Sequence, residues 1–267
     1  MRLPMRLRRA RATCEGRSSA YNGLRRAGDD AIRLLPSGVF ARSSATRAVF
    51  DVSFAASFLF CLGAYLLGSV PFALLLGFWR GVDIRAAGSR NIGATNLART
   101  AGRRWGIAAF VLDFLKGVLP VLSVAWTASG RPAIVGAVPE SGGPRIEHVQ
   151  MACALSAILG HILPIYLRFR GGKGVATSFG AISGLSWMAA LIAGTVWGAV
   201  YLATRTVSIA SLIAALVFPA ATFFIHRSSP PDVAIPLDLL TVAVAAIILI
   251  RHHSNIRRLL SGREHRF

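Results

Sequence analysis

The chain has 267 residues, of which 54% are hydrophobic and only 15% are charged. A soluble domain normally carries about 25% charged residues, so this composition argues against a water-soluble protein and predicts an integral membrane protein. The formal net charge is +19, but no basic face with interleaved aromatic residues indicates a nucleic-acid partner. We instead expect the basic residues to face anionic lipid headgroups and an anionic substrate.

The first fifty residues differ from the rest of the chain. They contain eleven arginines, scattered Gly, Ser and Pro, and only short apolar runs. Such a segment cannot bury a core. Residues 1–50 are therefore predicted to be an extension without fixed structure, and residues 51–267 to form one membrane domain.

The first stretch long enough to cross a bilayer runs from Phe54 to Trp79. Its 26 uncharged residues correspond to about 39 Å of helix, enough to cross about 30 Å of hydrocarbon with tilt. The sequence Gly68-Ser69-Val70-Pro71 near its middle predicts a kink or a break. Further spans are predicted at residues 105–126, 149–167, 207–225 and 234–250.

Residues 174–204 are uncharged and are long enough for either one overlong helix or a hairpin of two short ones. The three basic clusters, at residues 80–104, 168–173 and 251–266, should share the cytoplasmic side. Only a hairpin, with a turn near Ser183 to Ser186, places all three there. The predicted fold is therefore all-α and polytopic, with about seven transmembrane helices.

This topology places the N-terminus outside, so the arginine-rich extension would be translocated against the positive-inside tendency. Two explanations remain open for this conflict. Either the natural start lies near Val49 or Val52 and the extension is an artefact of gene prediction, or the protein has a real inverted or additional N-terminal arrangement.

Two loops rich in hydrogen-bond donors are predicted on the same side of the membrane. The first reads DIRAAGSRNIGATNLART, residues 83–100, where small residues let backbone N–H groups approach an anion and polar side chains supply further donors. The second reads RFRGGKGVATS, residues 168–178, but it is no Walker A loop because Leu167 and Gly174 occupy two of the defining positions. A flexible polar loop is the alternative for the first, yet the two loops together favour a phosphate-sized substrate.

Several single residues have both a structural and a functional interpretation. Asp113 and Lys116 are spaced i and i+3 inside a span, so they form either a structural ion pair or a functional one. His161 is interpreted as a packing residue rather than a base. Ser208 is either a helix N-cap or part of the site, whereas His252 and Asn255 lie one helical turn apart and could face the site together.

Motifs for several other chemistries are absent from the sequence. It contains no His-x-x-x-x-Asp pair, no HExxH, no CxxC and no carboxylate cluster. Its three cysteines, Cys14, Cys61 and Cys153, lack the spacing of metal ligands. We therefore expect neither a metal nor another cofactor.

Taken together and in this order, the motifs resemble those of the PlsY family, bacterial membrane acyltransferases that use acyl phosphate as donor. The resemblance covers about residues 62–260 through GSVPFALLLG, DIRAAGSRNIGATNLART, LDFLKG, GHILPIYLRFRGGKGVATSFG, SIAS and RHHSNIRRLL. It implies transfer of a fatty acyl group to the 1-hydroxyl of sn-glycerol 3-phosphate, giving lysophosphatidate and phosphate in the first step of phospholipid synthesis. It also implies a multi-pass protein of the bacterial cytoplasmic (inner) membrane, in contact with membrane lipids, whose active site lies on the cytoplasmic face.

The resemblance assigns roles to residues of both loops and of the C-terminal segment. The catalytic residues that it implies are Lys173, Arg99, Ser89, His252 and Asn255, and the substrate-binding or phosphate-binding residues are Asn91, Gly93, Thr95, Gly172, Gly174 and Ser208. Arg90 departs from the family, which usually has Gly at this position, and this departure puts backbone contact there in doubt. Two other classes of function remain as alternatives: a membrane transporter of a phosphorylated solute, and a membrane binding or scaffold protein.

Overall fold

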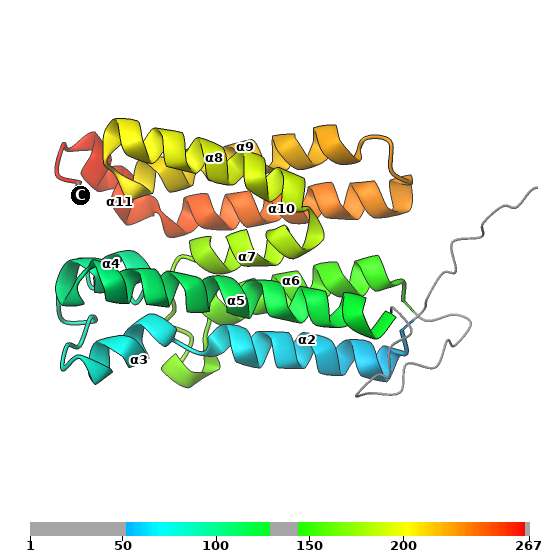
Figure 1. Cartoon of the computed structure of the whole chain (residues 1–267), viewed down its shortest axis with the longest axis horizontal. Helices are drawn as coiled ribbons and strands as arrows, with labels where there is room; N and C mark the ends of the chain where they lie inside the picture. Colours follow the sequence, from blue (N-terminus) through cyan, green and yellow to red (C-terminus); the bar gives the residue numbers. More distant parts are fainter. Residues whose placement is uncertain (1–51, 129–143, 265–267) are drawn as a thin grey trace, which may run out of the picture. The chain divides into compact units, whose positions relative to one another are not determined.

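The computed structural model describes residues 52–128 and 144–264, and the predicted N-terminal extension lies outside these ranges. The described residues form helices without any strand, which confirms the all-α class (Figure 1). The helices are α2 (Phe54–Ser69), α3 (Phe72–Trp79), α4 (Ala94–Ala101), α5 (Arg103–Ala128), α6 (Ile146–Ile162), the short 3-10 helix η1 (Ile165–Leu167), α7 (Val175–Leu185), α8 (Trp187–Thr204), α9 (Val207–His226), α10 (Pro231–Arg251) and α11 (His253–Leu260).

Six helical segments in the described ranges are long and apolar enough to cross a membrane. The first of them combines α2 and α3, which are separated at Val70 and Pro71, so the predicted break is confirmed. The predicted hairpin is also present, because α7 ends at Leu185 and α8 begins at Trp187. However, α7 has only 11 residues, or about 16 Å of helix against about 30 Å of hydrocarbon. The predicted count of seven spans is therefore not reproduced.

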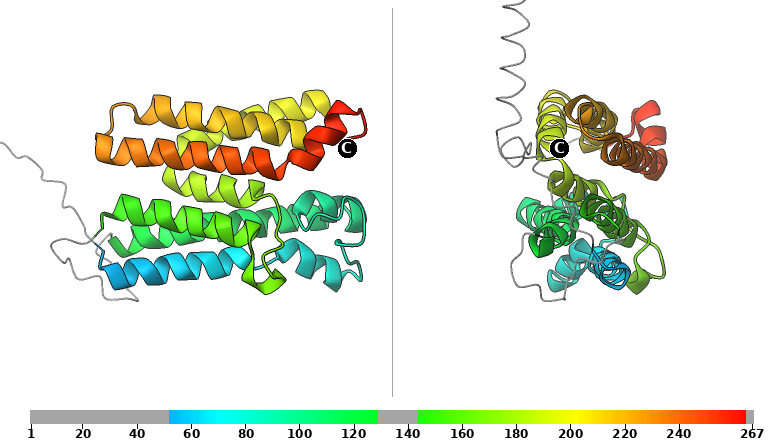
Figure 2. Two further views of the ribbon diagram at one scale, coloured as in Figure 1. Left: turned by 180° about the vertical axis from the view of Figure 1, so that it is seen from behind. Right: turned by 90° about the vertical axis from the view of Figure 1, so that its right-hand side faces the viewer.

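The helices of residues 52–264 form two groups with α7 between them (Figures 1 and 2). The first group contains α2 to α6 and the second contains α8 to α11. Helix α7 packs against α5, α6 and α8, and α6 also contacts α10. On the opposite flank, the described parts of α5 and α8 are not closely packed against each other. The two groups are thus joined along one flank and separated by α7 along the other.

Glycines allow close approach where α5 crosses α7 and where α2 crosses α6. A Cβ atom on Gly117 of α5 would overlap a backbone carbonyl of α7, and one on Gly180 of α7 would overlap a backbone carbonyl of α5. Gly68 and Gly160 have the same relation where α2 crosses α6. Such close backbone contacts through small residues are typical of packing between transmembrane helices.

A buried ion pair stabilises the break in the first span. Lys116 Nζ lies 2.8 Å from Asp113 Oδ1, and both side chains are almost fully buried. The same ammonium donates a hydrogen bond to the Val70 carbonyl, at 2.8 Å. Because a broken helix leaves backbone carbonyls without helical partners, this contact supports the structural interpretation of the Asp113–Lys116 pair.

Candidate active site

A polar cavity of about 700 Å³ lies where the first loop, the second loop and the C-terminal segment meet. Nine of the eleven predicted site residues line it, although they come from four separate parts of the chain: Ser89, Asn91, Gly93, Thr95, Arg99, Lys173, Ser208, His252 and Asn255. Gly172 and Gly174 are not among the lining residues. The fold therefore brings together nearly all of the side chains that the sequence analysis selected.

Asn96 shapes the first loop from the inside. Its buried side chain accepts a hydrogen bond from the Ser89 N–H at 2.8 Å and donates to the carbonyls of Ile84 at 2.8 Å and Ala87 at 3.1 Å. This network fixes the backbone at Ser89, next to the cavity. Gly93, the N-cap of α4, also lines the cavity, so the unpaired N–H groups of the first turn of α4 lie at its wall.

Arg90 adopts a backbone conformation that favours glycine, with φ at +61°. Its side chain is exposed, and Arg90 is not among the residues that line the cavity. A left-handed conformation is costly for residues that carry a Cβ atom. This cost gives a physical reason for glycine at this position and identifies the arginine as a local source of strain.

Replacing Arg90 with Gly is expected to stabilise the protein by about 1 kcal/mol and to leave the cavity unaltered, because it relieves the backbone strain at an exposed position. Thermal unfolding in detergent micelles would measure the change. Arg90→Ala is the matched control, since it removes the guanidinium but keeps the Cβ atom, and it should show no gain. Equal stabilisation by both variants would mean that the side chain, and not the backbone, causes the effect.

The glycines of the second loop hold it against the end of α6. The N–H groups of Gly171 and Gly172 donate to the carbonyls of Ile162 and His161, both at 3.2 Å. Arg251 donates from the other side to the carbonyls of both glycines, at 2.8 to 3.1 Å. A Cβ atom on Gly172 would overlap the His161 ring, so this ring packs against the loop, and it also lines the cavity.

This geometry alters the expected roles of Gly172 and Gly174. The Gly172 N–H already donates to a protein carbonyl, so it is not free for phosphate. Gly174 has φ at +84° and forms the N-cap of α7. Val175 and Ala176 follow it and line the cavity, so the free N–H groups at this wall belong to the first turn of α7.

Lys173 is the only residue of the GGKG sequence that lines the cavity. Its ammonium donates a hydrogen bond to Asn255 Oδ1. Burial, with smaller contributions from the positive charges of Arg258, Arg99 and Arg251, lowers the pKa of Lys173 to about 8 against the opposing effect of Glu264. The lysine is therefore mostly cationic at neutral pH, although its pKa lies only slightly above that pH.

His252 is held in one tautomer. Its Nδ1 lies 2.8 Å from the Ile248 carbonyl, which can only accept, so Nδ1 carries the proton and Nε2 is left as an acceptor. Burial, together with the charge of Lys173, lowers the pKa of His252 to about 4. The ring is thus neutral at physiological pH.

Glu264 also lines the cavity, although the sequence analysis did not select it. Its carboxylate accepts hydrogen bonds from Ser208 Oγ at 2.9 Å, Asn255 Nδ2 at 2.6 Å and Arg258 Nε at 2.7 Å. Burial alone would raise the pKa of Glu264, but these hydrogen bonds outweigh it, so the net shift is downward and the group is ionised. The sequence feature that could have pointed to Glu264 is its position as a single acid within the basic C-terminal run SGREHRF.

Comparison with known proteins relates this site to an enzyme family. A family model described as glycerol-3-phosphate acyltransferase matches residues 58–262. The glycerol-3-phosphate acyltransferase of an Anaeromyxobacter species is 42% identical over 203 residues, which are 76% of this chain and 92% of the relative. The chain belongs to the glycerol-3-phosphate acyltransferase family. The enzyme of the same name from Aquifex aeolicus is 38% identical over 204 residues, covering 76% of this chain and 95% of the relative.

Solved structures of the acyltransferase family agree with the fold. The glycerol 3-phosphate form of PlsY, an integral membrane glycerol 3-phosphate acyltransferase, has a TM-score of 0.66 at 36% identity over 79% of this chain and 96% of that one. Its lysophosphatidic acid form has a TM-score of 0.64 at 35% identity, covering 79% and 95%. The resemblance found in the motifs is confirmed, and this acyltransferase is a multi-pass membrane protein rather than a transporter.

Proposed function

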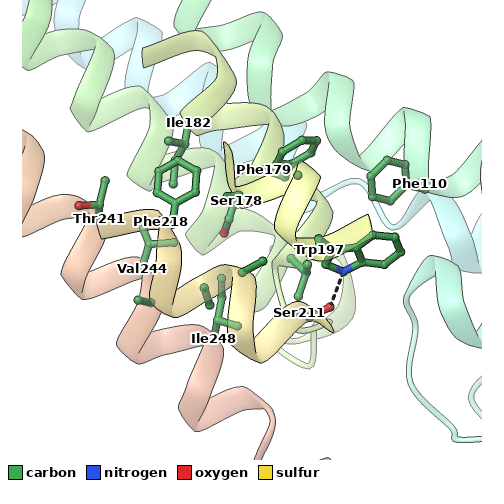
Figure 3. A pocket seen from close by; sticks show the side chains of 16 residues that line it. Phe110, Ser178, Phe179, Ile182, Trp197, Ser211, Phe218, Thr241, Val244 and Ile248 are labelled. Atoms are coloured by element: carbon green, nitrogen blue, oxygen red, sulfur yellow. Dashed lines mark hydrogen bonds between the residues drawn. The ribbon is translucent and has the colours of Figure 1, made fainter. Parts of the chain in front are cut away.

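We propose that the protein transfers a fatty acyl group from acyl phosphate to the 1-hydroxyl of sn-glycerol 3-phosphate, giving lysophosphatidate and phosphate. One observation carries this proposal: the polar cavity adjoins an apolar pocket of about 180 Å³ and shares Phe110, Val175, Trp197 and Ser211 with it (Figure 3). A reaction that joins a water-soluble alcohol to a lipid chain requires two such compartments with a common wall. The glycerol 3-phosphate and lysophosphatidic acid forms of PlsY support this assignment of substrate and product.

The polar cavity supplies cations and donors for two phosphorylated substrates. Lys173 and the first turn of α7 offer an ammonium and free N–H groups to a phosphate, and the first turn of α4, with Asn91, Gly93 and Thr95, offers further donors. Arg99 and Ser89 orient glycerol 3-phosphate. Gly172 and Gly174 act indirectly, because they set the path of the loop that presents Lys173.

The reaction needs no acyl-enzyme, since acyl phosphate is already activated. The 1-hydroxyl oxygen attacks the acyl carbon, the bond from that carbon to the phosphate oxygen breaks, and inorganic phosphate departs. A phosphate oxygen takes the hydroxyl proton, while the ammonium of Lys173 stabilises the negative charge on the leaving group. Catalysis consists mainly of holding the two substrates in line.

The C-terminal residues orient the reacting groups. His252, with a pKa of about 4, is a weak base at neutral pH. Its Nε2 therefore accepts a hydrogen bond from the substrate hydroxyl but does not take up the hydroxyl proton. Asn255 bonds to Lys173 on one side and to Glu264 on the other, which positions the ammonium. Ser208 donates to the same carboxylate and completes this wall.

The basic loops support a location for the site at the cytoplasmic face of the bacterial inner membrane. Exposed arginines of the loops and helix ends include Arg80, Arg85, Arg104, Arg168 and Arg170. The loops that hold the cavity belong to the same basic clusters, which favour the cytoplasmic side and anionic lipid headgroups.

The decisive experiment mixes the purified protein with labelled glycerol 3-phosphate and either acyl phosphate or acyl-CoA. We expect labelled lysophosphatidate from acyl phosphate and none from acyl-CoA. Product from neither donor would overturn the proposed activity. Product from acyl-CoA alone would overturn the proposed donor.

A further inference from the structure

The mouth of the apolar pocket is here its end beside the polar cavity, and the floor is its opposite end. At the mouth, Phe110 and Trp197 also line the polar cavity. At the other end lie Ile182, Phe218 and Thr241, which are only 2%, 7% and 1% exposed (Figure 3). A chain that enters at the mouth therefore reaches a buried floor.

One face of α7 connects the two ends. Its pocket-lining residues are Val175, Ser178, Phe179 and Ile182, which follow the i, i+3, i+4, i+7 spacing of a single helical face. The distance from the first to the last is about 10 Å along the helix axis. An acyl chain whose phosphate is bound at the start of α7 can run along this face toward the floor.

The side walls of the pocket include five small residues beside larger ones such as Phe179 and Ile248, and its floor contains the aromatic ring of Phe218. The small residues come from α8, α9 and α10 and are Ala193, Gly194, Ala214, Ala215 and Ala245. A Cβ atom on Gly194 would lie only 3.2 Å from the Phe179 ring, so the pocket is narrow between these two residues. The large ring of Phe218 lies beside Ile182, on the side of the pocket away from Phe110 and Trp197 (Figure 3).

We propose that Phe218, backed by Ile182 and Thr241, determines the longest fatty acyl chain that the enzyme accepts efficiently. The inference rests on the proposed function, because it assigns the pocket to the acyl chain of the donor. Each further methylene that fits into an apolar pocket favours binding, and each one that does not fit must bend or leave the pocket. Phe218 is thus a specificity-determining residue for donor length.

The test compares lauroyl, palmitoyl, stearoyl and arachidoyl phosphate as donors for the wild-type enzyme and for Phe218→Ala. The variant should raise the ratio of kcat/KM for the longest donor to that for the shortest by about tenfold. Phe218→Leu, a milder change, should shift the ratio in the same direction and serves if the Ala variant fails to fold. Phe224→Ala is the matched control, since this phenylalanine lies on the same helix but is 66% exposed.

The outcomes distinguish the role of Phe218 from the proposed function. An unchanged length profile in both Phe218 variants, with product still formed, would overturn the role of Phe218 and leave the proposed function intact. An equal shift in Phe224→Ala would also overturn it. Failure of the wild-type enzyme to use any acyl phosphate would instead overturn the proposed function.

Discussion

Replacing Lys173 with Ala is expected to lower kcat/KM by about a thousandfold or more while the protein remains inserted and folded. The loss follows from removing the one ammonium that the second loop presents to the cavity, where it stabilises phosphate charge in a partly dehydrated site. Initial rates with labelled glycerol 3-phosphate and acyl phosphate measure the effect. Wild-type rates in this variant would show that Lys173 is only a membrane anchor.

Arg170→Ala is the matched control for the loss of one positive charge. Arg170 belongs to the same loop but is exposed and does not line the cavity, so its removal should change the rate less than twofold, in keeping with the small contribution of exposed charges. Size-exclusion profiles and thermal unfolding of both variants in detergent establish that they remain folded.

The pH dependence provides a second readout of Lys173. Because the pKa of Lys173 is about 8, the cation is present below this pH and is lost above it. The kcat/KM of the free enzyme should therefore fall on the alkaline side with an apparent pKa near 8. Lys173→Arg keeps a positive charge at high pH, so in that variant this decline should disappear even if the rate is lower. Persistence of the same decline would assign it to another group.

Replacing Gly180 with Ala is expected to destabilise the protein by about 3 kcal/mol and to abolish most activity. The added methyl group overlaps the Phe114 carbonyl of α5, so it forces apart two helices that are in backbone contact. Helix α7 begins immediately after the loop that carries Lys173, and its displacement moves the ammonium. Thermal unfolding and acyl transfer rates are the measurements.

Gly198→Ala is the control for this substitution. Gly198 lies inside α8, and a Cβ atom there would meet no atom within 4 Å. The exchange should slightly stabilise the helix, by about 1 kcal/mol, because alanine has the higher helix propensity. A similar loss in both variants would point to a general intolerance of glycine replacement rather than to the crossing of α5 and α7.

Parts of the fold could be predicted because local chemistry determines them. Pro71 cannot continue a helix, so the break in the first span was visible in the sequence. The positions of the basic clusters predicted the turn that the structure places at Ser186. The short length of α7 was not predictable in this way, because counting uncharged residues does not reveal how far a helix reaches into the bilayer.

The site was predictable where its residues form dense local motifs, as in the two loops. It was not predictable where tertiary contacts create the function. Glu264 accepts a hydrogen bond from Ser208, 56 positions away in the chain, and Arg251 binds the carbonyl of Gly172 across 79 positions. No spacing rule in the sequence relates such pairs. The glycines were identified as important, but their close approach to α6 is visible only in the structure.

The unequal flanks of the helical assembly would give the two proposed substrates separate routes. The described parts of α6 and α10 contact each other, whereas those of α5 and α8 are not closely packed, and the mouth of the apolar pocket lies between Phe110 of α5 and Trp197 of α8. Lipid molecules would therefore exchange sideways with the bilayer on that flank, while glycerol 3-phosphate would arrive from water at the polar end. A neighbouring protein against α5 and α8 would slow the use of the lipid donor without hindering the soluble substrate, whereas the same neighbour against α6 and α10 would affect neither.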